Sequence, residues 1–316
     1  MVKPDDSSLD ADAQRAVEDR ATRILNRASA WDRFPTPVED IVAAANLRVA
    51  SSSAFDPRNV LAYIQNKTGG AVRAIKSALS KVFGLCDSDD SVIHIDDTVH
   101  PSKQNFLKLH ETGHHEIPTH RKLYRFFLDC DQTLSPEIAD RFEREANNFA
   151  RFALFQGDTY RQEAADCRLD INTPLRLAKR YGASAYASVR EFARTHHKAC
   201  VVYALESVEM SDDDRLCAPV RRIETSPPFR GQFDIPPDTV IGIEHALFCL
   251  IPFGRRMTPP TRLTMVDRNG ARHECVGEGF RTPYNIFLLV YPVRALTATS
   301  VIVPSGIRRM DTRFPR

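Results

Sequence analysis

The stretch His110-Glu111-Thr112-Gly113-His114 places two imidazoles and one carboxylate on about one turn of a predicted helix. Residues four apart in a helix lie on the same face, so His110 and His114 can bind one Zn²⁺ at about 2.0–2.1 Å each. Glu111 is one step further round that face, within reach of a water held by the metal, where it can act as a general base. The pattern predicts a zinc-dependent hydrolase of the metallopeptidase type.

The residues around the motif predict a short amphipathic helix. Pro101 and Ser102 form a helix start in which Ser102 is the expected N-cap. Pro118 sets the helix end near His115 or Glu116. The alternative, an ordinary pair of surface or core histidines, leaves Glu111 unexplained.

A second predicted helix supplies the third ligand that a catalytic zinc needs. It starts at Ser135, the expected N-cap, followed by Pro136. Glu143 and Asn147 lie one turn apart on it, so Glu143 can complete a His2Glu site. Asn147 can hydrogen-bond the second nitrogen of a ligating imidazole. Glu145 points about 200° away from Glu143 in a helix and is expected to face water.

These two motifs together resemble the ImmA/IrrE family of zinc metallopeptidases. The resemblance rests on His110-Glu111-x-x-His114 and, about thirty residues later, Glu143-x-x-Ala146-Asn147-x-Phe149-Ala150. It spans roughly residues 10–195. The preceding elements match it too: a helix at 37–45, a strand at 47–50 and a hairpin of 81–87 with 91–96. The chain departs from the family pattern at residues 155–157 and in the long segment 56–80.

The resemblance also implies a substrate and a form of control. The substrate would be a helix-turn-helix transcriptional repressor, cut to derepress stress or antiphage genes, and the chain is similar to regulators of antiphage (CBASS) operons. In such an enzyme a cysteine holds the zinc site inactive, and single-stranded DNA produced by damage activates it. Cys86 is the candidate inhibitory fourth ligand, with a small buried apolar residue as the alternative reading. Cys130 is a second candidate.

The peptide substrate is expected to add as an extended strand to an exposed sheet edge. We expect residues 91–96 to form that edge beside the cleft. The oxyanion-stabilising group is left open among three candidates, His120, Tyr124 and Tyr160.

Other helices are predicted at 9–28, 59–67 and 71–81. Residues 171–197 predict two short helices joined by a turn at Gly182, a helix-turn-helix-like unit. Its cations are few, so both a structural role and DNA binding stay open. They are Lys179, Arg180, Arg190 and Arg194.

After residue 197 the pattern changes to short β-branched and aromatic runs. Strands are predicted at 201–205, 240–243, 246–251, 263–266 and 286–291, with a hairpin turn at Asp267-Arg268-Asn269-Gly270. Longer members of the family carry a GAF-like sensory domain here. Arginines interleaved with aromatic residues suit single-stranded nucleic acid, although an ordinary solvated face has the same composition. They are Arg255, Arg256, Arg262, Arg281 and Arg294 with Phe253, Phe280 and Tyr284.

The expected fold class is α+β. A mainly helical, zincin-like peptidase domain with a small sheet covers residues 1–170, the helix-turn-helix-like unit 171–197, and a mixed α/β GAF-like domain 198–316. Seven cysteines without a Cys-x-x-Cys pair fit reduced thiols. With no signal pattern at the N-terminus and no long apolar run, we expect a cytoplasmic protein without a membrane partner.

A net charge of +2 gives no global signal for nucleic acid. A DNA-binding regulator whose zinc site is purely structural is the alternative function. It has no use for Glu111.

Overall fold

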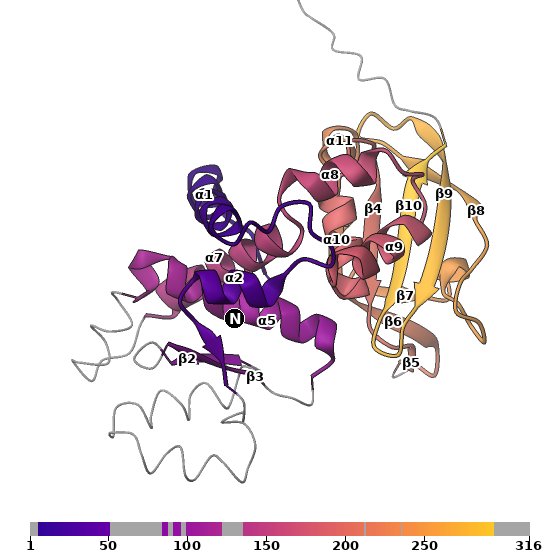
Figure 1. Ribbon diagram of the computed structural model, residues 1–316. Coiled ribbons are helices and arrows are strands. Elements are labelled where there is room, and N and C mark those ends of the chain that lie inside the picture. The colour runs from indigo at the N-terminus through magenta and orange to yellow at the C-terminus, as the bar shows by residue number, and fades with distance from the viewer. Residues whose placement is uncertain are drawn as a thin grey trace, which may run out of the picture.

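The computed structural model describes residues 6–50, 84–87, 91–95, 99–121, 135–211, 213–234 and 236–293, with the backbone alone at 84–87. The predicted helices 59–67 and 71–81 lie outside these ranges, as do Tyr124, Cys130 and Arg294. The fold is α+β: a helical N-terminal region is followed by a C-terminal antiparallel sheet (Figure 1). The expected fold class is therefore confirmed at this level.

The described part of the N-terminal region contains the helices α1 (Ala11–Arg27), α2 (Val38–Ala44), α5 (Pro101–Glu116) and α7 (Pro136–Leu154). Ser135 caps α7 as predicted, because its side chain accepts from the Ile138 N–H. The predicted cap of α5 is wrong by two residues. His100 is the N-cap, and its Nδ1 accepts from the backbone N–H of Ser102, which is already inside the helix.

The small sheet contains β1 (Arg48–Val49), β2 (Gly84–Asp87) and β3 (Val92–Ile95) in the order β1-β3-β2. The hairpin of β2 and β3 is antiparallel, as predicted. The expectation that residues 91–96 form the sheet edge is wrong. β3 is the central strand, because β1 pairs with one side of it in parallel and β2 pairs with the other. Among the described strands, β1 and β2 are therefore the edges of this sheet. Both β2 and β3 pack against α5.

Three further helices follow: α8 (Asp158–Ala165), α9 (Asn172–Tyr181) and α10 (Ala185–Thr195). Gly182 ends α9 with a φ of +70°, which favours glycine, and Ser184 caps α10 through the Ala187 N–H. The predicted pair of helices is confirmed. α9 and α10 lie between the N-terminal helices and the large sheet (Figure 1).

The large sheet has the strand order β5-β6-β4-β10-β9-β8, and β7 pairs with β6. Every neighbouring pair in it is antiparallel, so the described residues lack the expected mixed α/β pattern. The strands are β4 (Val201–Leu205), β5 (Glu209–Met210), β6 (Leu216–Thr225), β7 (Val240–Gly242), β8 (Thr261–Val266), β9 (Arg272–Arg281) and β10 (Ile286–Pro292). A short helix, α11 (Pro227–Gln232), follows β6.

The strand predicted at 246–251 is wrong. Phe248–Leu250 form a 3-10 turn, η1, that packs against β9 without pairing to it. A Cβ built on Gly279 would lie 1.9 Å from the Leu250 carbonyl oxygen, so this glycine permits the close approach. The strands β6 and β9 were not predicted, because Pro219, Arg221 and Arg222 interrupt the apolar pattern of β6 and charged residues interrupt that of β9.

The core runs without a break from the helices to the sheet. One cluster of buried apolar side chains includes Leu25 of α1, Phe149 of α7, Phe192 of α10 and Phe287 of β10. The sheet is therefore packed directly on the helical region. A membrane-spanning helix needs about 20 apolar residues, and no helix in the described ranges reaches that combination of length and hydropathy.

Candidate metal centre

The centre is built on two helices in close contact. α5 carries the His-Glu-x-x-His motif, and α7 packs along it. Gly113, inside the motif, lies against α7: a Cβ added there would be 3.1 Å from the Phe149 side chain. The small residue lets the backbones approach, so side chains from both helices reach one point.

Three ligand atoms converge between these helices. Nε2 of His110 lies 3.1 Å from Nε2 of His114. The Glu143 carboxylate is 3.4 Å from the first nitrogen and 3.6 Å from the second. Two ligands held at 2.0–2.1 Å in tetrahedral geometry lie about 3.3 Å apart. The spacing therefore fits a single zinc ion.

Asn147 determines which nitrogen of His110 faces this point. The Asn147 amide nitrogen donates to the carbonyl of Asp6, so its oxygen is the atom that meets Nδ1 of His110, at 3.1 Å. An amide oxygen only accepts, so Nδ1 carries the proton. In the neutral ring, Nε2 then presents a lone pair to the cluster, as a metal ligand must. The hydrogen bond predicted between Asn147 and this imidazole is therefore present.

His114 is held by a longer chain of hydrogen bonds. Its Nδ1 is 3.1 Å from Nδ1 of His120, whose Nε2 is 2.8 Å from a carboxylate oxygen of Glu145. The carboxylate accepts from His120 Nε2, leaving His120 Nδ1 as the acceptor for His114. One proton arrangement satisfies every atom, and it again leaves a bare Nε2 on His114.

The prediction that Glu145 faces water is therefore wrong. The side chain is buried, bonded to His120 on one side and to Arg141 on the other at 2.7 Å. The 200° separation from Glu143 was correct, but the segment after α5 covers that face of α7. His120 is fully buried and stacks on Phe142. The indication of this contact in the sequence was weak. It consists of a histidine after Pro118 and of Arg141 and Glu145, which are four residues apart on one helix.

The electrostatics of the cluster favour a bound cation. Burial lowers the pKa of His114 to about 4, which keeps its ring neutral. At His110 burial acts in the same direction, but the hydrogen bond and charge of Glu143 outweigh it and raise the pKa. Burial acts to raise the pKa of Glu143, yet the two imidazoles hold it well below its usual range. The ionised carboxylate therefore attracts positive charge to this point, which the raised pKa of His110 reflects and which a bound cation would supply.

The Glu145 carboxylate, which is bonded to His120, is ionised like that of Glu143. Burial acts to raise the pKa of Glu145, but the hydrogen bonds from His120 and Arg141 lower it. Burial is the largest effect on His120 and lowers its pKa. A neutral His120 and an ionised Glu145 are the states that the hydrogen-bond chain requires.

The remaining candidates are placed as follows. Glu111 is buried on α5 between the two ligating histidines. Tyr160 is fully buried, and its hydroxyl is bonded to Ser188. Cys86 lies in β2, where its backbone pairs with Ile93, and its side chain is outside the described atoms. Tyr124 and Cys130 are not in the described ranges.

Residues 66–190 match the model of a protein family described as the IrrE N-terminal-like domain, peptidase M78. The matched region contains the whole candidate cluster, and His110, His114 and Glu143 fit the site of an HExxH zinc metallopeptidase. No curated protein sequence matches the chain significantly. Among solved structures, a Mycobacterium tuberculosis transcriptional regulator is similar, with a TM-score of 0.47 and 14% identity, covering 87% of this chain and 75% of that one.

Proposed function

We propose that this peptidase domain makes the protein a zinc-dependent endopeptidase that cleaves a helix-turn-helix transcriptional repressor and so derepresses stress or antiphage genes. The observation that carries the proposal is the convergence of His110, His114 and Glu143 with Glu111 buried between the two histidines. The repressor substrate follows from the resemblance to the ImmA/IrrE family.

The chain's own residues have separate tasks in this mechanism. His110, His114 and Glu143 would hold the metal, while Asn147 and His120 keep the two rings in the metal-binding tautomer. When bound, zinc supplies Lewis-acid chemistry that makes a water nucleophilic near neutral pH. Glu111 takes a proton from the attacking water and delivers it to the leaving amine.

Replacing Glu111 tests this assignment. Glu111→Gln should retain about one zinc per chain and lose at least about 100-fold in cleavage of a helix-turn-helix repressor that the wild type cleaves, because general acid–base catalysis contributes about 10²–10⁴-fold. Glu116→Gln on the same helix is the matched control and should cleave normally. A Glu111→Gln protein with full activity would refute the mechanism.

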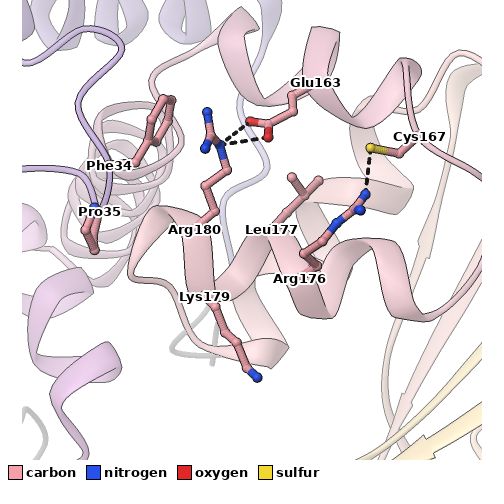
Figure 2. Close-up of a pocket in the computed structure, with 8 residues that line it drawn as sticks. All are labelled: Phe34, Pro35, Glu163, Cys167, Arg176, Leu177, Lys179 and Arg180. Carbon is pink, nitrogen blue, oxygen red and sulfur yellow. Dashed lines mark hydrogen bonds and ion pairs between the residues drawn. The ribbon is translucent and has the colours of Figure 1, made fainter.

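The DNA-binding alternative is disfavoured by the cations of the α9–α10 unit. Figure 2 shows the Arg180 guanidinium turned toward the Glu163 carboxylate, at 2.7 Å, and it also lies 3.9 Å from the centre of the Phe34 ring. Arg190 and Arg194 are both paired with Glu224 of β6. Three of the four cations predicted for this unit are therefore engaged in contacts within the protein, and Lys179 is the fourth. Specific binding of the unit to duplex DNA, without proteolysis, would favour the alternative.

Control by Cys86 and single-stranded DNA is part of the proposal. β2 packs beside α5, so a thiolate from this strand is a reasonable fourth ligand in the resting enzyme. Cys86→Ser should then raise basal cleavage, with Cys167→Ser as the control.

The single-stranded DNA that activates the enzyme would bind the C-terminal region, residues 198–316. Among its candidate arginines, Arg262 is paired with Glu274, whereas Arg255, Arg256 and Arg281 are exposed. Unchanged basal activity and no effect of single-stranded DNA would leave a constitutive peptidase.

A further inference from the structure

A groove of about 1670 Å³ connects the metal cluster to the large sheet. His110, Glu143 and Asn147 line one end of it. It continues along the first half of α5 and past the α9–α10 turn, and reaches Phe280 of β9 and Phe287 of β10. The helical region and the C-terminal sheet therefore both form its walls. We refer to it as the interdomain groove.

The groove is strongly cationic. Among the described residues that line it, eight are lysine or arginine and two are carboxylates, Glu143 and Glu191. Glu143 belongs to the metal cluster, and Glu191 is paired with Arg151 at 2.9 Å. Arg190 and Arg194 are balanced by Glu224, which is not part of the lining. Lys179 and Arg256 are exposed and have no carboxylate partner among the described residues. An anionic occupant is the electrostatic complement.

The far end of the groove combines these cations with aromatic rings. Two guanidinium groups lie near the Tyr186 ring of α10, that of Arg190 at 5.1 Å and that of Arg221 of β6 at 5.2 Å from its centre. Arg256 lies 5.2 Å from the centre of the Phe280 ring. The Phe280 ring holds the exposed Arg256 guanidinium in place, and its N–H donors can still bind a ligand. Met257 and the 75% exposed Tyr284 add apolar surface.

We propose that the interdomain groove binds an acidic, partly apolar segment of the substrate polypeptide beside the bond to be cut. Carboxylates of that segment pair with the exposed side chains of Arg256 and Lys179, and its apolar side chains lie on Met257 and Tyr284. A polypeptide is favoured over nucleic acid because the groove is continuous with the metal cluster. This inference rests on the proposed function and assigns the C-terminal sheet to substrate selection.

Binding of short peptides to the full-length Glu111→Gln protein tests the proposal without requiring cleavage. The probes are fluorescent peptides of alternating glutamate and leucine, or glutamine and leucine, followed by anisotropy. The acidic peptide should bind at least about tenfold more tightly, a difference of about 1.4 kcal/mol. Arg256→Glu should remove most of that difference. Arg272→Glu, an exposed residue of the same sheet that does not line the groove, changes the net charge equally and should not.

Each result separates this inference from the proposed function. Equal binding of both peptides, or equal effects of the two charge reversals, overturns the groove assignment and leaves the peptidase proposal intact. Binding of a single-stranded thymidine oligonucleotide alone, lost in Arg256→Glu, also overturns it and assigns the groove to nucleic acid. Selective binding of the acidic peptide together with a wild-type protein that cleaves no repressor keeps the groove and refutes the function.

Discussion

The metal cluster and the interdomain groove meet at His110 and Glu143, yet they are built in opposite ways. The cluster comes from two adjacent helices and has a hydrogen-bond partner for each imidazole nitrogen that faces away from the proposed metal position. The groove is open and assembled from α5, α9, α10 and three strands of the large sheet. Reaction chemistry in this molecule is therefore local, whereas recognition depends on how two distant parts of the chain pack.

The largest effect is expected on zinc binding when a ligand is removed from the cluster. Glu143→Ala should abolish stable zinc binding, because two neutral imidazoles remain to hold a divalent cation in a buried site. Metal content after dialysis, measured by atomic emission, checks this. Glu137→Ala, an exposed residue in the first turn of the same helix, is the control. Equal zinc in both variants would show that another group is the third ligand.

A second variant tests the link between the two regions. Glu224 of β6 receives Arg190 and Arg194 of α10, and all three side chains are largely buried. Glu224→Ala removes the carboxylate that these two buried arginines share and should lower the free energy of unfolding by about 3 kcal/mol. The exposed pair of Arg262 and Glu274 offers the comparison, because Glu274→Ala should cost less than about 1 kcal/mol. Urea denaturation measures both.

The same pair should show a defined pH dependence. Burial acts to raise the pKa of Glu224, but Arg194 and Arg190 outweigh it and lower the pKa. A depressed carboxyl pKa stabilises the fold fully above the ordinary value of about 4.3. The stability difference between wild type and Glu224→Ala should therefore shrink as the pH falls below that value. A constant difference would mean that the charge of Glu224 is unimportant.

The smallest effect is expected from Glu145, which supports the cluster through its hydrogen bond with His120. Glu145→Ala should weaken zinc binding by about 10- to 100-fold, as is usual when a partner of a ligating histidine is lost. Glu145→Gln should recover part of the affinity, because its amide oxygen still accepts from His120. Arg141→Ala should have little effect, since that side chain is 61% exposed. Competition with a chelator measures the zinc affinity of all three variants. Unchanged affinity in Glu145→Ala would show that the hydrogen bond from His120 is not needed to orient the His114 ring.

Much of the cluster was predictable because it depends on local spacing. His110 and His114 share a helix face at four residues apart, and Glu143 and Asn147 do so on the next helix. The caps and glycine turns that set α7, α9 and α10 are also local. Where the local pattern was ambiguous, the predictions failed: an apolar run at 246–251 fits a strand as well as the 3-10 turn that it forms.

The sequence by itself therefore determined which residues are candidate metal ligands and which helices carry them, because residue spacing along a helix fixes the directions of the side chains. Only the tertiary structure decided that Glu145 supports His120, that β3 lies inside its sheet, and that Arg256 and Tyr186 share a groove with His110. These relations join segments that are far apart in the chain. No periodicity encodes them, because they arise from the packing of whole elements against one another.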